Sequence, residues 1–375
     1  MKVLHLIDSG GLYGAERMLL ALVAEQIKQG LEPMILSAGY LGEEEKAIEH
    51  EAKRLGLPIL EWRMSPGLNL KEALKIIKWS ENNRISVLHS HGYKFDILVV
   101  MSKMFKKRIP FVTTIHGYVG SKRFSRMWVY ETIDKLVLPY IDRVCVVSSR
   151  MLEIPFIKRL KSEQKYYVGN GIGGRAIKAS NEKLDVDYKY KFMNKKFNII
   201  SVGRLSPEKN FSTLIEAMAD HRLEQFSVGL TIIGEGGLKK NHQNQVSELG
   251  LENRVNLLGY RDDVAEIMHH ADLLIMPSLT EGMPITLLEA MREGLPILAS
   301  SVGSIPDVLE GGSAGFLLRP TTDAKELASE ILLVIKDDIG RKQKSEWAEF
   351  IFQKNYSSKN MADNYLKIYE SLSES

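Results

Sequence analysis

The stretch ADLLIMPSLTEGMPITLLEAMREGLPILASS, residues 271–301, holds two short apolar runs on either side of a helical pattern. The runs at 271–278 and 295–301 are largely apolar, which is typical of strands buried on both faces of a parallel sheet. Between them, residues 284–293 repeat apolar side chains at helical spacing, with Pro284 placed as the first helical residue and a Gly-Leu-Pro sequence after the last. The stretch predicts a strand, a helix and a second parallel strand.

The same alternation of apolar runs and helical patterns extends along the chain and restarts once. Helices between buried parallel strands cover both faces of a sheet, so each half predicts one doubly wound, Rossmann-like α/β domain. The expected strands are residues 2–7, 33–37, 85–90, 111–116 and 143–148 in the first half, and 197–203, 230–236, 254–260, 271–278 and 295–301 in the second.

The pattern also divides the chain into segments. A polar, lysine-rich stretch with little periodicity separates the two halves and is expected to be a linker. The final stretch has Met361, Tyr365, Ile368 and Tyr369 at helical spacing, so it predicts a helix whose aromatic stripe packs back on the first domain. The expected segments are an N-terminal domain 1–172, a linker 173–196, a C-terminal domain 197–355 and a C-terminal helix 356–375.

The composition fits a soluble globular protein, since 44% of the 375 residues are apolar and 26% are charged. The 50 Lys and Arg residues against 47 Asp and Glu residues leave a formal net charge of +3, which does not favour nucleic-acid binding. Cys145 is the single cysteine, so no internal disulfide can form and the cytoplasm is the expected location. The opening MKVLHLID does not match a secretory signal, and no run approaches the ~20 apolar residues of a membrane-spanning helix.

Ligands of doubly wound domains bind beyond the carboxyl ends of the strands, so the loops after the strands are the candidate sites. The first of them, DSGGLYGAER at 8–17, places Gly10, Gly11 and Gly14 before a helix, where glycines let a ligand approach the backbone. A tight turn without a ligand explains the same glycines equally well. The helix is expected over 15–30, with Met18, Leu19, Leu22, Val23 and Ile27 on its inner face.

Two cations mark the loop after the first strand of the second domain. Arg204 stands at the strand end and Lys209 follows five residues later. Such a pair can hold a diphosphate, with the guanidinium as a fork and the ammonium as a point charge. The alternative is two solvated surface cations, the usual state of these residue types.

The loop and helix start around Pro284 carry a second candidate set. The first turn of a helix presents unpaired N–H groups and the positive end of the helix dipole, which complement a diphosphate. Glu281 lies just outside that turn and can face a group beyond the phosphates, while Glu289 can accept hydrogen bonds from vicinal hydroxyls. The alternative makes Glu281 a dipole partner and Glu289 a solvated helix residue.

Three further loops follow strands. Gly234 and its neighbouring glycines leave room for a flat group near the backbone. Tyr260 and Arg261 lie in a loop whose backbone can contact the edge of a base, although a plain strand–turn–helix connection has the same pattern. His116 directly follows a strand and is either a structural hydrogen-bonding residue or part of the site.

Together these features resemble the retaining glycosyltransferases of the GT-B fold, family 4, over nearly the whole chain. EGMPITLLEAM resembles the E-x7-E segment, GRLSPEKN the Arg/Lys diphosphate loop, SGGLYGAERML the N-terminal glycine loop, TTIHGY the cleft histidine and VGNGI an interdomain motif. The resemblance implies a GT-B architecture, in which two Rossmann-like domains face each other across a cleft. It also implies transfer of a hexosyl or related group from a UDP- or GDP-type sugar to a glycan or lipid-linked glycan of a cell-surface polysaccharide.

The resemblance implies roles for individual residues as well. Glu281 contacts the donor sugar and His116 touches it near the reacting centre, so these two are the implied catalytic residues. Arg204 and Lys209 bind the diphosphate, and Glu289 binds the ribose hydroxyls. The implied donor-binding residues are Gly11, Arg204, Lys209, Gly234, Tyr260, Arg261, Gly282, Met283, Pro284, Ile285, Thr286 and Glu289.

The expected chemistry is stabilisation of a leaving diphosphate by preorganised charges and amides. Retention of the anomeric configuration is implied by the resemblance, and because no carboxylate stands out as a covalent nucleophile, attack on the face of departure is the hypothesis. A metal is not expected, since Asp185 and Asp187 lie in the linker and His89 with His91 is a poor ligand set. No cofactor is expected beyond the nucleotide sugar.

The sequence leaves other functions open. A nucleotide-sugar epimerase or a sugar phosphorylase can share the architecture, and so can a non-catalytic protein that binds nucleotide sugars. The cationic and aromatic segments 102–110 and 120–131 are candidates for peripheral contact with an anionic membrane at its inner face, with solvated surfaces as the alternative. The base, the sugar, the acceptor, the linkage and the oligomeric state are not encoded in any local pattern.

Overall fold

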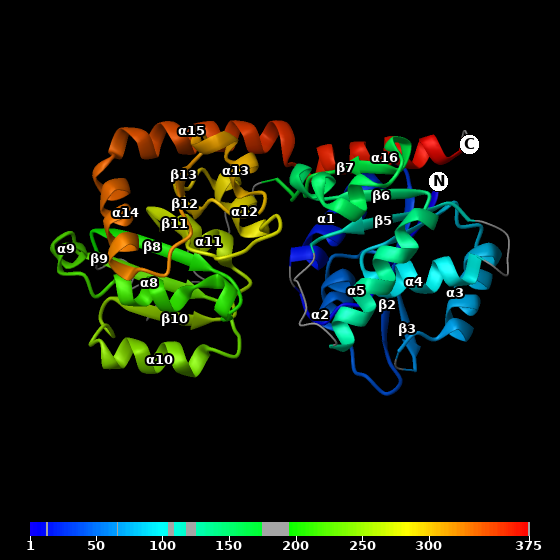
Figure 1. The fold of residues 1–375 in the computed structure, drawn as a ribbon, viewed down its shortest axis with the longest axis horizontal. Helices are drawn as coiled ribbons and strands as arrows, with labels where there is room; N and C mark the ends of the chain where they lie inside the picture. Colours follow the sequence, from blue (N-terminus) through cyan, green and yellow to red (C-terminus); the bar gives the residue numbers. More distant parts are fainter. Residues whose placement is uncertain (13, 66, 104–108, 118–124, 175–194, 374–375) are drawn as a thin grey trace. The chain divides into compact units, whose positions relative to one another are not determined.

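The computed structural model describes residues 1–12, 14–65, 67–103, 109–117, 125–174 and 195–373. The chain divides into two compact units, one formed by Met1–Gly173 with Tyr356–Ser375 and the other by Gly174–Asn355 (Figure 1). The last segment of the chain is therefore part of the N-terminal unit. Most of the expected linker, including Asp185 and Asp187, lies outside the described residues.

A wholly parallel, seven-stranded sheet forms the centre of the N-terminal unit, in the order β3-β2-β1-β4-β5-β6-β7 (Figure 1). The direction of winding reverses between β1 and β4, as in other doubly wound folds. The strands are β1 Lys2–Ile7, β2 Glu32–Tyr40, β3 Ile59–Met64, β4 Val87–Ser90, β5 Phe111–Ile115, β6 Arg143–Val146 and β7 Lys165–Tyr167.

Helices cover this sheet, with α1 packed against α16 and α4 packed against α3 and α5. The inner face of α1 is buried as expected, except that Ile27 is 42% exposed because Gln26 takes the buried position in the last turn. The helices are α1 Gly14–Lys28, α2 Ala47–Arg54, α3 Leu70–Asn82, α4 Tyr93–Lys103, α5 Arg126–Val137, α6 Pro155–Lys158 and α16 Ser358–Ser373.

The C-terminal unit repeats the plan with a parallel, six-stranded sheet in the order β10-β9-β8-β11-β12-β13. Its winding reverses between β8 and β11, and one buried apolar cluster joins the sheet to α8 and α14. The strands are β8 Phe197–Val202, β9 Val228–Ile233, β10 Val255–Gly259, β11 Leu273–Met276, β12 Ile297–Ser300 and β13 Phe316–Leu318. The helices are α8 Phe211–Ala217, α9 His221–Gln225, α10 Lys239–Glu248, α11 Val264–Met268, α12 Ile285–Glu293, α13 Ile305–Val308, α14 Ala324–Lys336 and α15 Asp338–Asn355.

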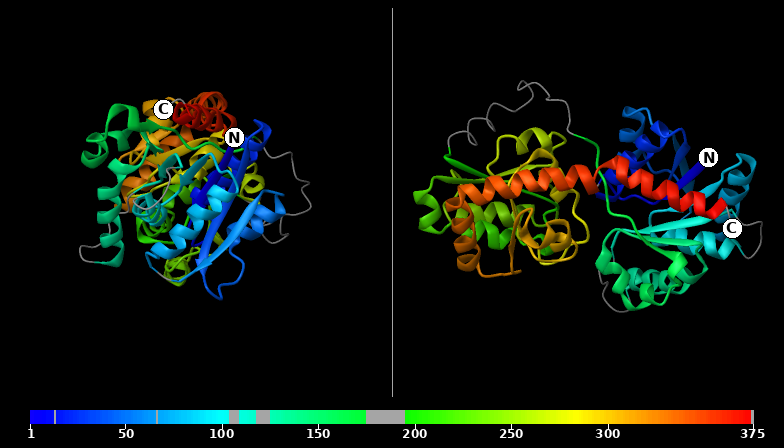
Figure 2. Two further views of the ribbon diagram at one scale, coloured as in Figure 1. Left: turned by 90° about the vertical axis from the view of Figure 1, so that its right-hand side faces the viewer. Right: turned by 90° about the horizontal axis from the view of Figure 1, so that it is seen from above.

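The final helix, α16, lies along the N-terminal unit (Figure 2). Met361, Tyr365, Ile368 and Tyr369 are all at most 5% exposed, so the aromatic stripe of the sequence is a packing face. The chain enters this helix beside Ile172, whose amide donates to the Tyr356 carbonyl and whose carbonyl accepts from the Ser358 amide, at 3.1 and 2.8 Å.

None of the helices in the described ranges has both the length and the apolarity that crossing a bilayer requires. The cationic residues Lys106, Lys107 and Arg108 of the segment 102–110, and residues 120–124 of the segment 120–131, lie outside those ranges.

The crossing of the two chain segments at Gly171 predicts a difference in stability between two variants. A Cβ at Gly171 would lie 2.4 Å from the Ser357 carbonyl oxygen, whereas a Cβ at Gly173 would meet nothing within 4 Å. We expect Gly171→Ala to lower the free energy of unfolding by about 1–3 kcal/mol, because the α16 segment must shift. Gly173→Ala is the control and should leave urea denaturation nearly unchanged; equal midpoints for both variants would contradict the packing described here.

Candidate functional site

The loops after β8 and β11 lie side by side at the carboxyl edge of the second sheet. These strands are neighbours, and the amide of Leu279 after β11 donates to the carbonyl of Glu208 after β8 at 2.8 Å. The side-chain amide of Asn210 donates to the carbonyls of Pro277 and Thr321 at 3.1 and 2.9 Å. Three loops are therefore held together, with the two-cation loop next to the start of α12.

Lys209 and Glu281 form an ion pair within this group of loops. Lys209 Nζ lies 2.6 Å from Glu281 Oε1, and Ser278 Oγ donates to the same oxygen at 2.7 Å. The side chains of Lys209 and Glu281 are only 19% and 8% exposed, so water screens their charges weakly. Lys209 is therefore not the solvated surface cation that the sequence left as an alternative.

Arg204 has a more open environment than Lys209. Its side chain is 57% exposed, and its guanidinium donates to Glu208 Oε1 at 3.0 Å. Burial alone would raise the pKa of the Glu208 carboxyl, but hydrogen bonds from Ser206, from its own amide and from Arg204 outweigh burial and lower that pKa. Glu208 therefore stays ionised and holds the guanidinium over the loop.

Two glycines at this edge are required by close approaches of the backbone. Gly234, after β9, has a φ of +141°, and a Cβ there would lie 1.9 Å from the Gly203 carbonyl oxygen. Gly303, after β12, has a φ of +56°, and a Cβ there would lie 2.1 Å from the Glu281 carbonyl oxygen. Backbone packing explains Gly234 without a ligand, and Gly303 brings the loop after β12 against the Glu281 loop.

The start of α12 follows directly from the Glu281 loop. Pro284 is the N-cap, with extended backbone at φ −74° and ψ 126°, so the helix begins at Ile285, one residue later than expected. A proline cap brings no side-chain acceptor, which leaves the first-turn N–H groups directed toward the space before the helix. The Gly282 carbonyl accepts from the amide and the hydroxyl of Ser304 at 3.1 and 2.7 Å. Met283 and Ile285 are buried, whereas Gly282, Pro284, Thr286 and Glu289 are partly exposed.

Tyr260 and Arg261 follow β10 at the same edge of the sheet. Tyr260 is 55% exposed. The guanidinium of Arg261 donates to both carboxylate oxygens of Asp263, at 2.8 and 2.5 Å. Arg261 therefore stabilises its own loop, and its place beside a base stays a prediction.

In the N-terminal unit, Gly11 and His116 lie beyond the carboxyl ends of β1 and β5. The Gly11 amide donates to the hydroxyl oxygen of Ser9 at 3.2 Å, and Ser9 Oγ is 2.9 Å from Glu16 Oε1, so a serine closes the glycine turn. His116 directly follows β5, and its Nε2 lies 3.4 Å from Nδ1 of His91. Burial lowers the pKa of His116 to about 4, so the ring is neutral at physiological pH.

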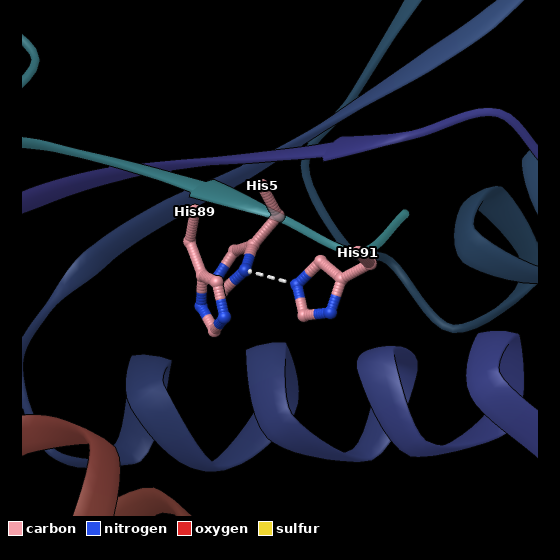
Figure 3. Close-up of side chains that lie close together, drawn as sticks. All are labelled: His5, His89 and His91. Atoms are coloured by element: carbon pink, nitrogen blue, oxygen red, sulfur yellow. Dashed lines mark hydrogen bonds between the residues drawn. The ribbon is translucent and has the colours of Figure 1, made fainter. Parts of the chain in front are cut away.

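Three other histidines lie close together (Figure 3), and one of them, His91, contacts His116. His5 of β1, His89 of β4 and His91 just after β4 have ring nitrogens within 4.8 Å of one another, the residue type and spacing of a metal centre. Hydrogen bonds already engage all six of their ring nitrogens, so the trio does not fit a metal ion without losing those bonds. The partners are Gln26 and His91 for His5, Tyr369 and Thr114 for His89, and His5 and His116 for His91.

Sequence reasoning missed four residues that shape the donor-side loops, namely Glu208, Asn210, Ser278 and Ser304. Each of them forms a hydrogen bond to a neighbouring loop or to a charged side chain, and none belongs to a recognisable sequence motif of its own. Asn210 carried the clearest signal, because Asn between a loop and a helix often adopts the left-handed conformation, and its φ is 57° here.

Two protein-family models match the chain. The model for glycosyl transferases group 1 matches residues 185–351, and the model for Glycosyltransferase Family 4 matches residues 13–162. The two matches fall on different units and together cover most of the chain.

Curated relatives and solved structures agree with these matches. The chain is 26% identical over 279 residues to UDP-Gal:alpha-D-GlcNAc-diphosphoundecaprenol alpha-1,3-galactosyltransferase of Escherichia coli, which covers 72% of each chain. It is 25% identical over 312 residues to N-acetyl-alpha-D-glucosaminyl L-malate synthase of Bacillus anthracis, covering 81% of this chain and 79% of that protein. HepE of Anabaena in complex with UDP has a TM-score of 0.81 at 23% identity over the whole of both chains, a likeness that shows the GT-B fold.

The conformation and contacts of Asn210 predict an ordered effect of two substitutions. Asn210→Gly keeps the left-handed backbone but removes the bonds to Pro277 and Thr321, so we expect a loss of about 1–2 kcal/mol in the free energy of unfolding. Asn210→Ala removes the same bonds and, unlike the glycine variant, keeps a Cβ on a left-handed residue, which costs about 1 kcal/mol more than the glycine variant. Urea denaturation measures both, and an alanine variant as stable as the glycine variant would contradict the strained conformation.

Proposed function

Because this chain belongs to the glycosyltransferases, with a family 4 domain in its N-terminal unit and a group 1 domain in its C-terminal unit, we propose that it transfers a sugar from a nucleotide-diphosphate sugar to a hydroxyl of a glycan or lipid-linked glycan. The observation that carries the proposal is the Lys209–Glu281 pair, which stands at the carboxyl edge of the sheet beside the open start of α12.

This arrangement suits the departure of a diphosphate. Breaking a sugar–phosphate bond moves negative charge onto the phosphate oxygens, and donors fixed before the reaction stabilise that charge without reorganising. An ammonium has three N–H donors, so the single bond from Lys209 to Glu281 leaves donors for phosphate oxygens. Arg204 and the first-turn amides of α12 would add a guanidinium and the positive end of a helix dipole.

A UDP-sugar is the proposed donor and a cell-surface glycan the proposed acceptor. Support for the donor comes from a structural relative bound to UDP and from a sequence relative whose name specifies UDP-Gal. The same sequence relative acts on a diphosphoundecaprenol-linked sugar, which supports a lipid-linked acceptor and peripheral membrane contact at the cytoplasmic face. In this reading Glu289 binds the ribose and Glu281 the donor sugar, and neither a metal nor a further cofactor is required.

The test of the function is transfer itself. The purified chain is incubated with UDP-hexoses and GDP-hexoses, each with and without an undecaprenyl-diphosphate-linked sugar. The products are separated by chromatography that resolves epimeric sugar nucleotides, and each is then identified by its mass. A new acceptor of one hexose more in mass supports the proposal. Conversion of one sugar nucleotide into another without acceptor indicates an epimerase. Release of a sugar 1-phosphate from a glycan when inorganic phosphate is added indicates a phosphorylase, and binding without turnover indicates a non-catalytic protein.

Retention with attack on the face of departure is the proposed stereochemistry. Glu281 accepts two hydrogen bonds through one oxygen, which suits a carboxylate that positions Lys209 better than one that forms a covalent bond. The anomeric coupling in the NMR spectrum of the first product should match that of the donor. An inverted anomer would exclude this route.

The cations of the site predict a selective loss of activity. Lys209→Met should lower kcat by roughly 10²–10³-fold, because one preorganised donor to the leaving group is lost. Lys239→Met is the control, since Lys239 is 40% exposed and pairs with Glu235 outside this loop group. Removing Lys209 also leaves the largely buried Glu281 carboxylate without its cation, which can destabilise the fold. The double variant Lys209→Met with Glu281→Gln has no such unpaired charge, so it separates an effect on folding from an effect on catalysis. Unchanged kcat in well-folded Lys209→Met would remove Lys209 from the proposed mechanism.

A further inference from the structure

A continuous run of hydrogen bonds crosses the N-terminal unit from α16 to His116. The Gln26 carboxamide lies between Tyr369 and His5, with Nε2 3.4 Å from the Tyr369 hydroxyl and Oε1 2.8 Å from His5 Nε2. His5 Nδ1 is 3.0 Å from His91 Nε2 (Figure 3), and His91 Nδ1 is 3.4 Å from His116 Nε2. Four of these five side chains are buried, and His116 stands at the end nearest the edge of the sheet.

The histidines of this run are neutral, so the position of the proton on one ring determines its position on the next. Burial lowers the pKa of His5 and His116 to about 4 and holds that of His91 well below its usual value. A neutral imidazole has one N–H and one bare nitrogen, so it donates on one side and accepts on the other. The direction of one hydrogen bond therefore fixes the direction of the next.

Gln26 supplies the starting direction. A carboxamide oxygen only accepts, so His5 has its proton on Nε2 and a bare Nδ1. His91 must then donate through Nε2 to His5, which leaves its own Nδ1 bare. His116 must in turn donate through Nε2 to His91.

The other end of Gln26 satisfies the same orientation. Its NH₂ group donates to the Tyr369 hydroxyl, which is then free to donate to His89 Nδ1 at 2.6 Å. His89 Nε2 donates to Thr114 Oγ1 at 2.8 Å, and Thr114 bonds Tyr365 at 2.8 Å. If the Gln26 carboxamide were rotated by 180°, donor and acceptor would exchange in every hydrogen bond on both sides. The network therefore has two possible arrangements of its protons, and the orientation of Gln26 selects one.

We infer that Gln26 is a positioning residue that sets the tautomer of His116, with the proton on Nε2 and a bare Nδ1. A bare ring nitrogen accepts a hydrogen bond from a hydroxyl, whereas a protonated one does not. His116 thereby presents an acceptor for a hydroxyl group of a sugar substrate, a use that rests on the proposed function. The tautomer itself does not depend on that function.

The tautomer is measured directly by NMR. The full chain is labelled with ¹⁵N-histidine, and long-range ¹H–¹⁵N correlations distinguish protonated from bare ring nitrogens; the His116 signals are assigned from their loss in His116→Gln. The expected result is a protonated Nε2 and a bare Nδ1 at His116. A protonated Nδ1 with a bare Nε2 in the unmodified chain would overturn the inference.

Two glutamine substitutions near the end of α1 separate positioning from packing. Gln26→Met removes the carboxamide at similar volume, so His116 should populate both tautomers. Gln29→Met is the matched control, because Gln29 directly follows α1 and its carboxamide donates to Asp363 of α16 at 2.7 Å, outside the network. A His116 spectrum that is the same in Gln26→Met as in the unmodified chain would overturn the inference. If sugar transfer is found, Gln26→Met should also lower kcat about tenfold with little change in donor KM, while Gln29→Met should not; failure to detect transfer leaves the NMR result intact.

Discussion

The reversal of winding within each parallel sheet governs where this protein places its polar groups. The reversal lies between β1 and β4 in one sheet and between β8 and β11 in the other. Connections leave such a point in opposite directions, so the loops at the carboxyl ends of the strands separate instead of covering each other. In the C-terminal unit, Lys209 and Glu281 meet in the loops beyond this point. In the N-terminal unit, His5 of β1 and His89 of β4 lie on the two strands that flank it, and His91 follows β4. Topology selects both places before any particular side chain is considered.

The sequence predicted the central strands well and the outer strands poorly. A strand between two neighbours is buried on both faces, and its apolar run is visible in the sequence. Three of the four edge strands, β3, β7 and β13, were missed, whereas the edge strand β10 was predicted. β3 alternates apolar residues with Glu61 and Arg63, and β7 begins with a lysine. β13 is apolar, but its three residues are too few to stand out as a strand. The packing face of α16 was predicted correctly because its pattern is long and regular. Four large side chains recur at helical spacing on one face, and all four are buried.

The candidate site was predictable to the level of the loops but not of the contacts. Alternating strands and helices place Arg204, Lys209 and Glu281 at one edge of a sheet, because all parallel strands end there. The contact between Lys209 and Glu281 joins residues 72 positions apart, and it depends on β8 and β11 being neighbours, which no local pattern states. The contacts of Asn210 and Ser304 were not predicted for the same reason, since their partners belong to other loops. Sequence patterns specify the edge of the sheet at which a residue lies, and strand order specifies which residues it contacts there.

The polar interior of the N-terminal unit shows why strand order matters beyond the loops. His5 and His89 occupy central strands, where apolar side chains would pack without a desolvation cost, and an unpaired buried polar group there would cost about 1–3 kcal/mol. Complete pairing avoids that cost, but it requires Tyr365 and Tyr369 from the last helix of the chain. The buried histidine network of the N-terminal unit therefore has its hydrogen bonds complete only after α16 packs on that unit. An apolar interior would fold without that dependence, whereas this one ties the geometry at the edge of the first sheet to the docking of α16.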